Sequence, residues 1–197
     1  MKRRLSLVLV SLMLISTLLT ACSSQPKSDV PASSETPAPS GKDTFVIGLE
    51  AGYAPFNWTQ MDDSNGGVAM QDSAEYAGGY DVEIAKRIAE GLGKELVIVK
   101  TEWDGLLPAL TSGMIDAIIA GMSPTAERAE SIDFTDNYYK SDLVMVVKKG
   151  GAYENASSIK DFKGAKITAQ LNTFHYSVID QIEGVKKETA MDNFPAM

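Results

Sequence analysis

Apolar and polar residues alternate over residues 45–147 in a pattern that predicts strands and helices by turns. Buried strands are expected at three short apolar runs, namely 45–49, 95–100 and 117–120. From Val82 to Leu92 apolar residues recur at helical spacing after Asp81, an N-cap residue type, which predicts a helix. A shorter helix is expected at 106–112. This order predicts an α/β fold whose parallel sheet has right-handed crossovers.

The same alternation begins again after Gly150 and Gly151. A further strand is expected at 143–147, then strand, helix and strand at 166–170, 174–181 and 185–189, and a helix opening at 192–197. We therefore expect a first lobe over 45–147 and a second over 148–197. About 50 residues are few for an independent core. The second lobe is thus expected to be incomplete and the chain to be a fragment.

The N-terminal residues have the pattern of a removable targeting segment. Three basic residues at positions 2–4 precede an apolar run at 5–19, whose 15 residues fall short of the roughly 20 that span a bilayer. The run ends in Leu-Thr-Ala-Cys, which resembles the bacterial lipobox. We expect a lipoprotein signal peptide at 1–21 and a membrane anchor of acyl chains such as palmitate on Cys22. The alternatives are an ordinary signal peptide with an incidental Cys, or a short uncleaved anchor.

Residues 22–44 are rich in Ser and Pro and contain no aromatic residue. Four of the eight prolines of the chain lie here, at positions 26, 31, 37 and 39. Such a segment cannot bury enough apolar surface to offset its ordering entropy. It is predicted to be a disordered tether between the anchor and the folded body.

Charge and cysteine content exclude several functional classes. The 197 residues include 18 Lys and Arg against 26 Asp and Glu, a net charge of −8. This balance disfavours nucleic acid as a partner, and also membrane binding through a basic patch. A single Cys excludes internal disulfides and multi-cysteine metal sites, and we expect no metal or cofactor.

Several motifs, in a fixed order, resemble the family-three periplasmic solute-binding proteins, the amino-acid receptors of ABC importers. They are Tyr53-Ala54-Pro55-Phe56, Gly79-Tyr80-Asp81-Val82-Glu83-Ile84-Ala85, Trp103-Asp104-Gly105-Leu106-Leu107-Pro108-Ala109-Leu110 and the stretch from Ile115 through Ser123, Arg128 and Ile132-Asp133-Phe134-Thr135 to Tyr139. The resemblance implies a periplasmic-binding-protein-like fold of two α/β lobes. It also implies a monomeric, lipid-anchored, extracytoplasmic receptor that delivers an amino acid to the transmembrane subunits of an ABC permease.

The resemblance also implies which residues bind the ligand in the first lobe. Arg128 matches the arginine that binds the ligand carboxylate, and Ser123 matches a second group for that carboxylate. The carbonyls of Ala120 and Gly121 match those that take the ligand ammonium. Without the family, the favoured interpretation of Arg128 is a solvated side chain paired with Glu127 or Glu130, because most arginines are exposed, and Ser123 would be part of a plain turn.

Tyr53 and Trp103 match two aromatic positions that pack on the ligand side chain, although either residue type is also common in cores and rims. Glu50 has two possible roles. It either contacts the end of the ligand side chain, which would favour a cationic or hydrogen-bond-donating amino acid, or it caps the following loop. In the second lobe Thr173 matches a carboxylate ligand, and Asn172 stands where the family has Gly, in a left-handed turn that Asn tolerates. The acidic residue that holds the ammonium in the family is expected beyond Met197.

Two other classes of function remain open at this point. The sequence contains no HExxH, GxSxG, Walker or GxGxxG motif. Its single histidine, His175, lies at the border of an expected helix. Chemistry by a carboxylate pair is open, since Asp104, Asp116 and Asp133 are available. The same fold occurs in cyclohexadienyl dehydratases and in signalling domains, so the alternatives are an enzyme of that kind or a ligand sensor.

Overall fold

The computed structural model describes residues 43–197, which belong to one compact unit. The expected signal peptide, Cys22 and nearly all of the tether lie outside the described residues. Among the helices at positions 43–197, none has the length and apolar character needed to cross a membrane. The account below therefore concerns the folded body alone.

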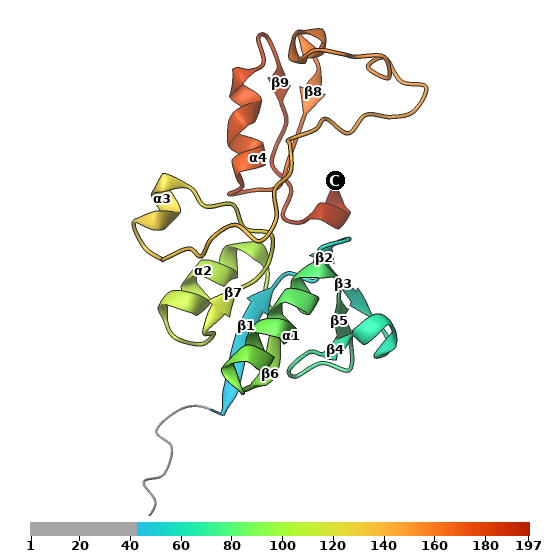
Figure 1. The fold of residues 1–197 in the computed structure, drawn as a ribbon. Helices are drawn as coiled ribbons and strands as arrows, with labels where there is room; N and C mark the ends of the chain where they lie inside the picture. Colours follow the sequence, from blue (N-terminus) through green and yellow to red (C-terminus); the bar gives the residue numbers. More distant parts are fainter. Residues whose placement is uncertain (1–42) are drawn as a thin grey trace, which may run out of the picture. The chain divides into compact units, whose positions relative to one another are not determined.

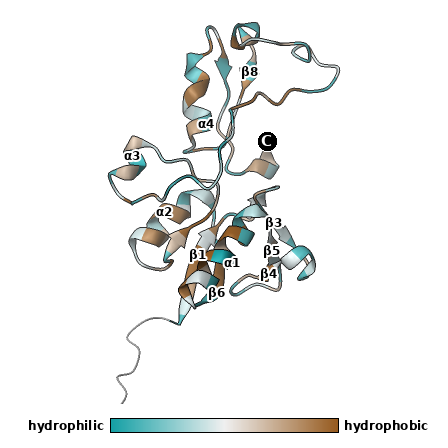
Figure 2. Cartoon of the chain, viewed as in Figure 1, coloured by the Kyte–Doolittle hydropathy of each residue, from teal (hydrophilic) through white to brown (hydrophobic). Residues whose placement is uncertain are grey.

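The core of the first lobe is a three-stranded parallel sheet in the order β6-β1-β7 (Figure 1). Its strands are β1 (Thr44–Leu49), β6 (Glu95–Lys100) and β7 (Ala117–Ile118). β1 pairs with β6 along its whole length and with β7 over two residues. The middle strand is strongly hydrophobic (Figure 2), and Ile47 and Leu49 are fully buried. The predicted parallel sheet is confirmed, although β7 is shorter than its apolar run.

Two helices cover this sheet. α1 (Tyr80–Leu92) packs against β1 and β6, and α2 (Trp103–Thr111) packs against β1 and β7. The N-cap of α1 is Gly79, so the expected N-cap role of Asp81 is wrong. Asp81 lies inside the first turn and is fully buried, and the side chains of Asn57 and Tyr138, rather than the helix N-terminus, supply the hydrogen bonds to its carboxylate. α2 begins three residues earlier than expected, which places Trp103 at its first position.

A second sheet, which the sequence pattern did not predict, is formed by the residues between β1 and α1 in the sequence. It is antiparallel, in the order β2-β3-β5-β4. Its strands are β2 (Gly52–Tyr53), β3 (Asn57–Gln60), β4 (Val68–Ala69) and β5 (Tyr76–Gly78), with a 3₁₀ turn at Ser64–Gly66. Each strand has two to four residues, too few for a period-two pattern to show.

The expected strand at 143–147 is wrong. After the short helix α3 (Ala126–Ala129) the chain runs without regular structure to residue 148, and residues 143–147 are all exposed. A strand needs a partner for its backbone groups. None of the described residues pairs with this segment, so its apolar composition does not produce a strand.

The second lobe has its own small core around a two-stranded parallel sheet. The strands are β8 (Lys166–Ile167) and β9 (Lys186–Lys187), both shorter than expected. The expected helix at 174–181 is divided into α4 (Phe174–Ser177) and a 3₁₀ helix (Val178–Gln181), and further 3₁₀ helices occupy Ile159–Phe162 and Phe194–Ala196. The core consists of Phe162, Ala165, Ile167, Ile179 and Ile182.

Candidate ligand-binding site

One cavity gathers side chains from both ends of the described chain. All eight residues that the sequence assigned to ligand binding line it: Glu50, Tyr53, Trp103, Ala120, Gly121, Ser123, Arg128 and Thr173. Five further lining residues were missed: Asn57, Gln170, Phe174, His175 and Phe194. The residues come from strand ends, helix starts and the turn after β7, which is where binding sites in open α/β sheets are typically found.

Arg128 lies in the short helix α3, whose N-cap Thr125 accepts a hydrogen bond from the Arg128 backbone N–H. Its terminal amines donate to the Ser123 carbonyl at 2.8 Å and to the Asn172 carbonyl at 3.0 Å. The guanidinium also stands over the Trp103 ring, 5.4 Å from its centre. Burial lowers the pKa of Arg128 from its ordinary value. A half-buried guanidinium that bonds only neutral carbonyls is well suited to take an anion.

The turn at Asn172 connects the second lobe to this guanidinium. Asn172 has φ +54°, which confirms the left-handed conformation expected of it. Its carbonyl accepts hydrogen bonds from Arg128 and from the Trp103 indole at 3.3 Å, and its side-chain amide donates to Asp104 at 2.9 Å. The Asn172 carbonyl therefore accepts a hydrogen bond from the Arg128 guanidinium, a donor that a ligand carboxylate would need.

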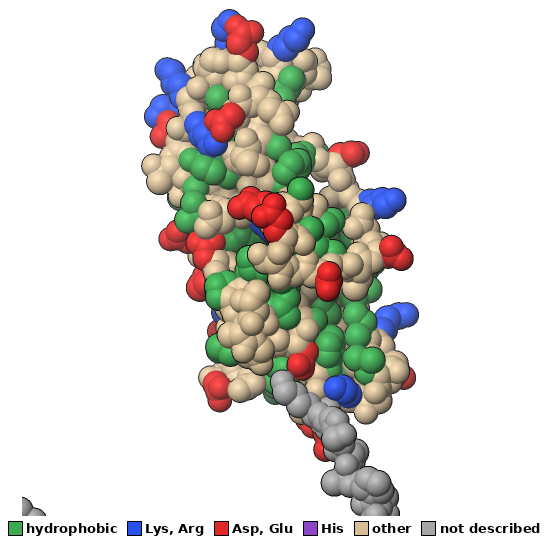
Figure 3. Space-filling model, turned by 90° about the vertical axis from the view of Figure 1, so that its left-hand side faces the viewer, with side chains coloured by type: hydrophobic (Ala, Val, Ile, Leu, Met, Phe, Trp, Pro, Cys, Tyr) green, Lys and Arg blue, Asp and Glu red, His purple; other side chains and the backbone are tan. Residues whose placement is uncertain are grey.

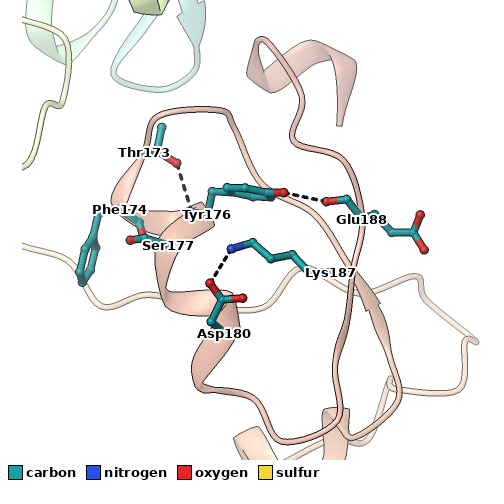
Figure 4. Close-up of polar contacts among 7 residues, drawn as sticks. All are labelled: Thr173, Phe174, Tyr176, Ser177, Asp180, Lys187 and Glu188. Atoms are coloured by element: carbon teal, nitrogen blue, oxygen red, sulfur yellow. Dashed lines mark hydrogen bonds and ion pairs between the residues drawn. The ribbon is translucent and has the colours of Figure 1, made fainter.

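Thr173 is the N-cap of α4 (Figure 4). Its hydroxyl accepts a hydrogen bond from the Tyr176 N–H at 3.3 Å and donates to the Gln170 carbonyl at 2.6 Å. α4 and the 3₁₀ helix after it are held to the chain at the end of β9, since the Tyr176 hydroxyl donates to the Glu188 carbonyl and Lys187 pairs with Asp180 (Figure 4). Thr173 is thus fixed in place at the cavity wall, and its expected role as a carboxylate ligand stays a prediction.

Glu50 lies at the end of β1 and is 7% exposed. Both of its carboxylate oxygens accept hydrogen bonds from the Gln170 amide, at 3.0 and 3.1 Å. Burial raises the pKa of Glu50, and the bond from Gln170 partly opposes this rise. These bonds go across the cavity wall to the second lobe rather than to the loop after β1. Gln170 was missed, although its place between a strand and the turn at Asn172 could have indicated it.

The raised pKa of Glu50 makes the stability of the protein depend on pH in a definite direction. A carboxyl group with a raised folded-state pKa costs nothing below its unfolded value of 4.5, and costs stability as the pH rises through the folded-state value. Glu50→Gln should therefore gain unfolding free energy relative to the wild type between pH 4 and pH 7. Urea denaturation at several pH values measures this. The exposed Glu90→Gln serves as the control, and a pH-independent difference for Glu50→Gln would contradict the prediction.

Aromatic rings form another wall of the cavity. Tyr53 in β2 stacks on Phe56, with ring centres 5.1 Å apart, and lies 4.4 Å from Phe194 near the C-terminal end. His175 also lines the cavity, although the sequence suggested only a position bordering a helix. Burial, with the nearby charge of Arg128, lowers the pKa of His175 and so favours its neutral form. The cavity thus combines an apolar wall with one acidic and one basic side chain.

Comparison with known proteins identifies the family. The model of the bacterial extracellular solute-binding proteins, family 3, matches residues 45–191. The chain belongs to this family. As a solute-binding protein it is 32% identical over 155 residues to the arginine-binding extracellular protein ArtP of Bacillus subtilis (strain 168), which covers 79% of this chain and 51% of ArtP. The chain spans about half the length of the curated relatives it matches.

Solved structures of related solute-binding proteins share the fold. The substrate-binding protein of an amino acid ABC transporter is 35% identical, with a TM-score of 0.63 over 76% of this chain and 61% of its own. An ancestral amino acid-binding protein, AncCDT-1, described as a precursor of cyclohexadienyl dehydratase, is 30% identical with a TM-score of 0.63, over 77% of this chain and 62% of its own. The fold is periplasmic-binding-protein-like, with a first α/β lobe and a partial second lobe.

Proposed function

We propose that this solute-binding protein is an extracytoplasmic receptor that binds an amino acid, with a cationic side chain favoured, and delivers it to an ABC importer. The observation that carries the proposal is one cavity that holds a guanidinium, Arg128, and a buried carboxylate, Glu50. A zwitterion with a positive side chain offers complementary charges to both groups. ArtP, an arginine-binding protein by name, and the substrate-binding protein of an amino acid ABC transporter support this assignment.

The ligand carboxylate would take the place of the carbonyl oxygen that Arg128 now binds on Asn172. A carboxylate accepts two parallel hydrogen bonds from a guanidinium, which a single carbonyl cannot do. Ser123 adds its hydroxyl or backbone N–H, and Thr173 contributes from the second lobe. Because these groups belong to both lobes, the ligand would favour a closed arrangement, which is a population shift driven by contacts to each side.

The ligand side chain would meet Glu50 and the aromatic wall. An amino acid with an ammonium or guanidinium group replaces the Gln170 amide as the partner of Glu50, and exchanges a neutral donor for a charged one. Residues 43–147 carry 18 acidic and 6 basic residues, and acidic side chains gather near the middle of the face drawn in Figure 3. A negative field of this kind attracts cations and raises their association rate.

Lipid anchoring at Cys22 and delivery to a permease are parts of the same proposal. Cys22 follows an apolar run and two small residues, the order typical of a lipidated cysteine, and the Ser- and Pro-rich segment after it has the composition of a tether. Metabolic labelling with a palmitate analogue tests the anchor. Wild-type protein should incorporate the label, and Cys22→Ser should not.

Ligand binding is tested by differential thermal unfolding against a panel of L-amino acids. A ligand that binds only the folded state raises the melting temperature, by an amount that grows with its concentration above Kd. The protein should be stabilised by arginine or lysine more than by glutamate. If no amino acid shifts its melting temperature while it melts cooperatively, the receptor assignment fails and the enzyme and sensor alternatives gain weight.

A further inference from the structure

A chain of hydrogen bonds leads from a buried carboxylate to the backbone at the floor of the cavity. The Tyr138 hydroxyl donates to Asp81 Oδ1 at 2.8 Å and accepts from the Gly121 N–H at 3.1 Å. The other carboxylate oxygen, Asp81 Oδ2, accepts from the Asn57 amide at 2.7 Å. Asp81 and Asn57 are both fully buried. Four separate segments, namely β3, α1, the turn after β7 and the stretch at Tyr138, are thus joined behind the cavity.

The geometry of the peptide unit between Ala120 and Gly121 links these hydrogen bonds to the Ala120 carbonyl. In a trans peptide unit the N–H and the C=O of the preceding residue point in opposite directions. The Gly121 N–H points toward Tyr138, so the Ala120 carbonyl of the same unit points away from it. Gly121 has φ +61°, and a Cβ placed on it would approach the Tyr53 ring within 3.2 Å, so the backbone here is closely confined.

The same hydrogen bonds also transmit the electrostatic effect of the Asp81 carboxylate. A carboxylate that accepts from two donors at 2.7 and 2.8 Å makes charge-assisted hydrogen bonds. Each bond in a chain polarises the next, so a negative Asp81 strengthens Tyr138 as an acceptor and, through the Gly121 amide, makes the Ala120 oxygen more negative. Among residues 43–197 no ion pair is found for Asp81, so no cation there neutralises its charge.

We propose that Tyr138 is a positioning residue for the ligand ammonium: its hydroxyl orients the Ala120–Gly121 peptide and connects it to Asp81. This rests on the proposed amino-acid binding, and on Ala120 and Gly121 as carbonyl ligands of the ammonium. It assigns roles to three residues, Asn57, Asp81 and Tyr138, none of which needs to touch the ligand. The Asp81 carboxylate acts at a distance and favours a cation over a neutral group at the same place.

The test compares two probes, L-arginine and 5-guanidinopentanoate, which is arginine without its α-amino group. Tyr138→Phe removes the hydroxyl and keeps the ring. Isothermal titration calorimetry should show a loss of about tenfold in affinity for L-arginine, the size expected for one hydrogen bond of this kind. Affinity for 5-guanidinopentanoate should change less than about twofold, because that probe has no ammonium. If the role of Tyr138 were purely structural, Tyr138→Phe would lower the affinity for both probes equally, and this result would overturn the proposal.

Tyr139→Phe is the matched control, since Tyr139 is half exposed and its ring only packs edge-on against Phe56 and Tyr80. It should bind both probes as the wild type does.

Asp81→Asn is a second variant that keeps the shape of the side chain and removes its charge, and it should show the same selective loss for L-arginine. Circular dichroism establishes that each variant is folded. If the wild type binds neither probe, the proposed function fails. If the wild type binds L-arginine, and both variants, Tyr138→Phe and Asp81→Asn, bind L-arginine as tightly as the wild type does, only the present inference fails.

Discussion

Arg128→Ala is expected to reduce amino-acid affinity by about 30-fold or more, because removing one partner of a hydrogen-bonded charge pair costs about 2–5 kcal/mol. Among residues 43–197, the guanidinium is the only basic side chain lining the cavity apart from His175, whose lowered pKa favours the neutral form. Without Arg128 the ligand carboxylate would lose its counter-charge and its two-pronged donor. Isothermal titration calorimetry with L-arginine measures the effect.

Two further variants separate charge from geometry at this position. Arg128→Lys keeps the positive charge but loses the planar fork, so it should bind more weakly than the wild type and more tightly than Arg128→Ala. Arg87→Ala removes an exposed arginine from α1 and should leave affinity unchanged, although it alters net charge by the same amount. Equal binding by the wild type and Arg128→Ala would exclude Arg128 as the carboxylate ligand.

Gly79→Ala is expected to be the most destabilising of the substitutions considered. Gly79 has φ +127°, a conformation that residues with a Cβ rarely adopt, and a Cβ here would lie 2.2 Å from the Phe56 carbonyl oxygen. Backbone strain and the clash together should lower the free energy of unfolding by about 2–5 kcal/mol. Gly79 is also the N-cap of α1, so a shift of Gly79 would displace Asp81 in the first turn. Urea denaturation followed by circular dichroism measures the loss.

Gly91→Ala provides the matched control. Gly91 lies near the end of the same helix, and a Cβ placed on it would meet no atom within 4 Å. Alanine in a helix is favoured over glycine, so this variant should gain about 0.5–1 kcal/mol. Opposite signs for the two glycine substitutions are therefore expected. A destabilisation of Gly79→Ala no larger than a few tenths of a kcal/mol would contradict the geometry of the loop before α1.

The cavity is built so that its charged groups are partly occupied by the protein itself. Glu50 is bonded to Gln170 and Arg128 to the Asn172 carbonyl, and both partners belong to one short stretch of the second lobe. A ligand must therefore replace protein contacts of the same type as its own. This makes affinity a difference between two sets of hydrogen bonds, which favours ligands whose groups are charged over ligands whose groups are neutral.

Local pattern was sufficient for the elements with long, regular periodicity. β1, β6 and α1 were predicted nearly to their bounds, because apolar spacing in a strand or helix reflects the face that each buries. The motifs around them identified the family and named eight of the residues that line the cavity. Asn172 was also predictable in its left-handed turn, since Asn tolerates that conformation without a tertiary contact.

Contacts between distant segments decided the rest. Strands β2 to β5 exist only because they pair with one another, whereas residues 143–147 have strand-like composition but no partner among the described residues. Asp81 looked like an N-cap, and became a buried carboxylate because Asn57 and Tyr138, 24 and 57 positions away, supply its hydrogen bonds. Gln170 meets Glu50 across 120 positions. A residue's own neighbours in sequence carry no record of such partners, because hydrogen bonding and burial depend on where the folded chain returns.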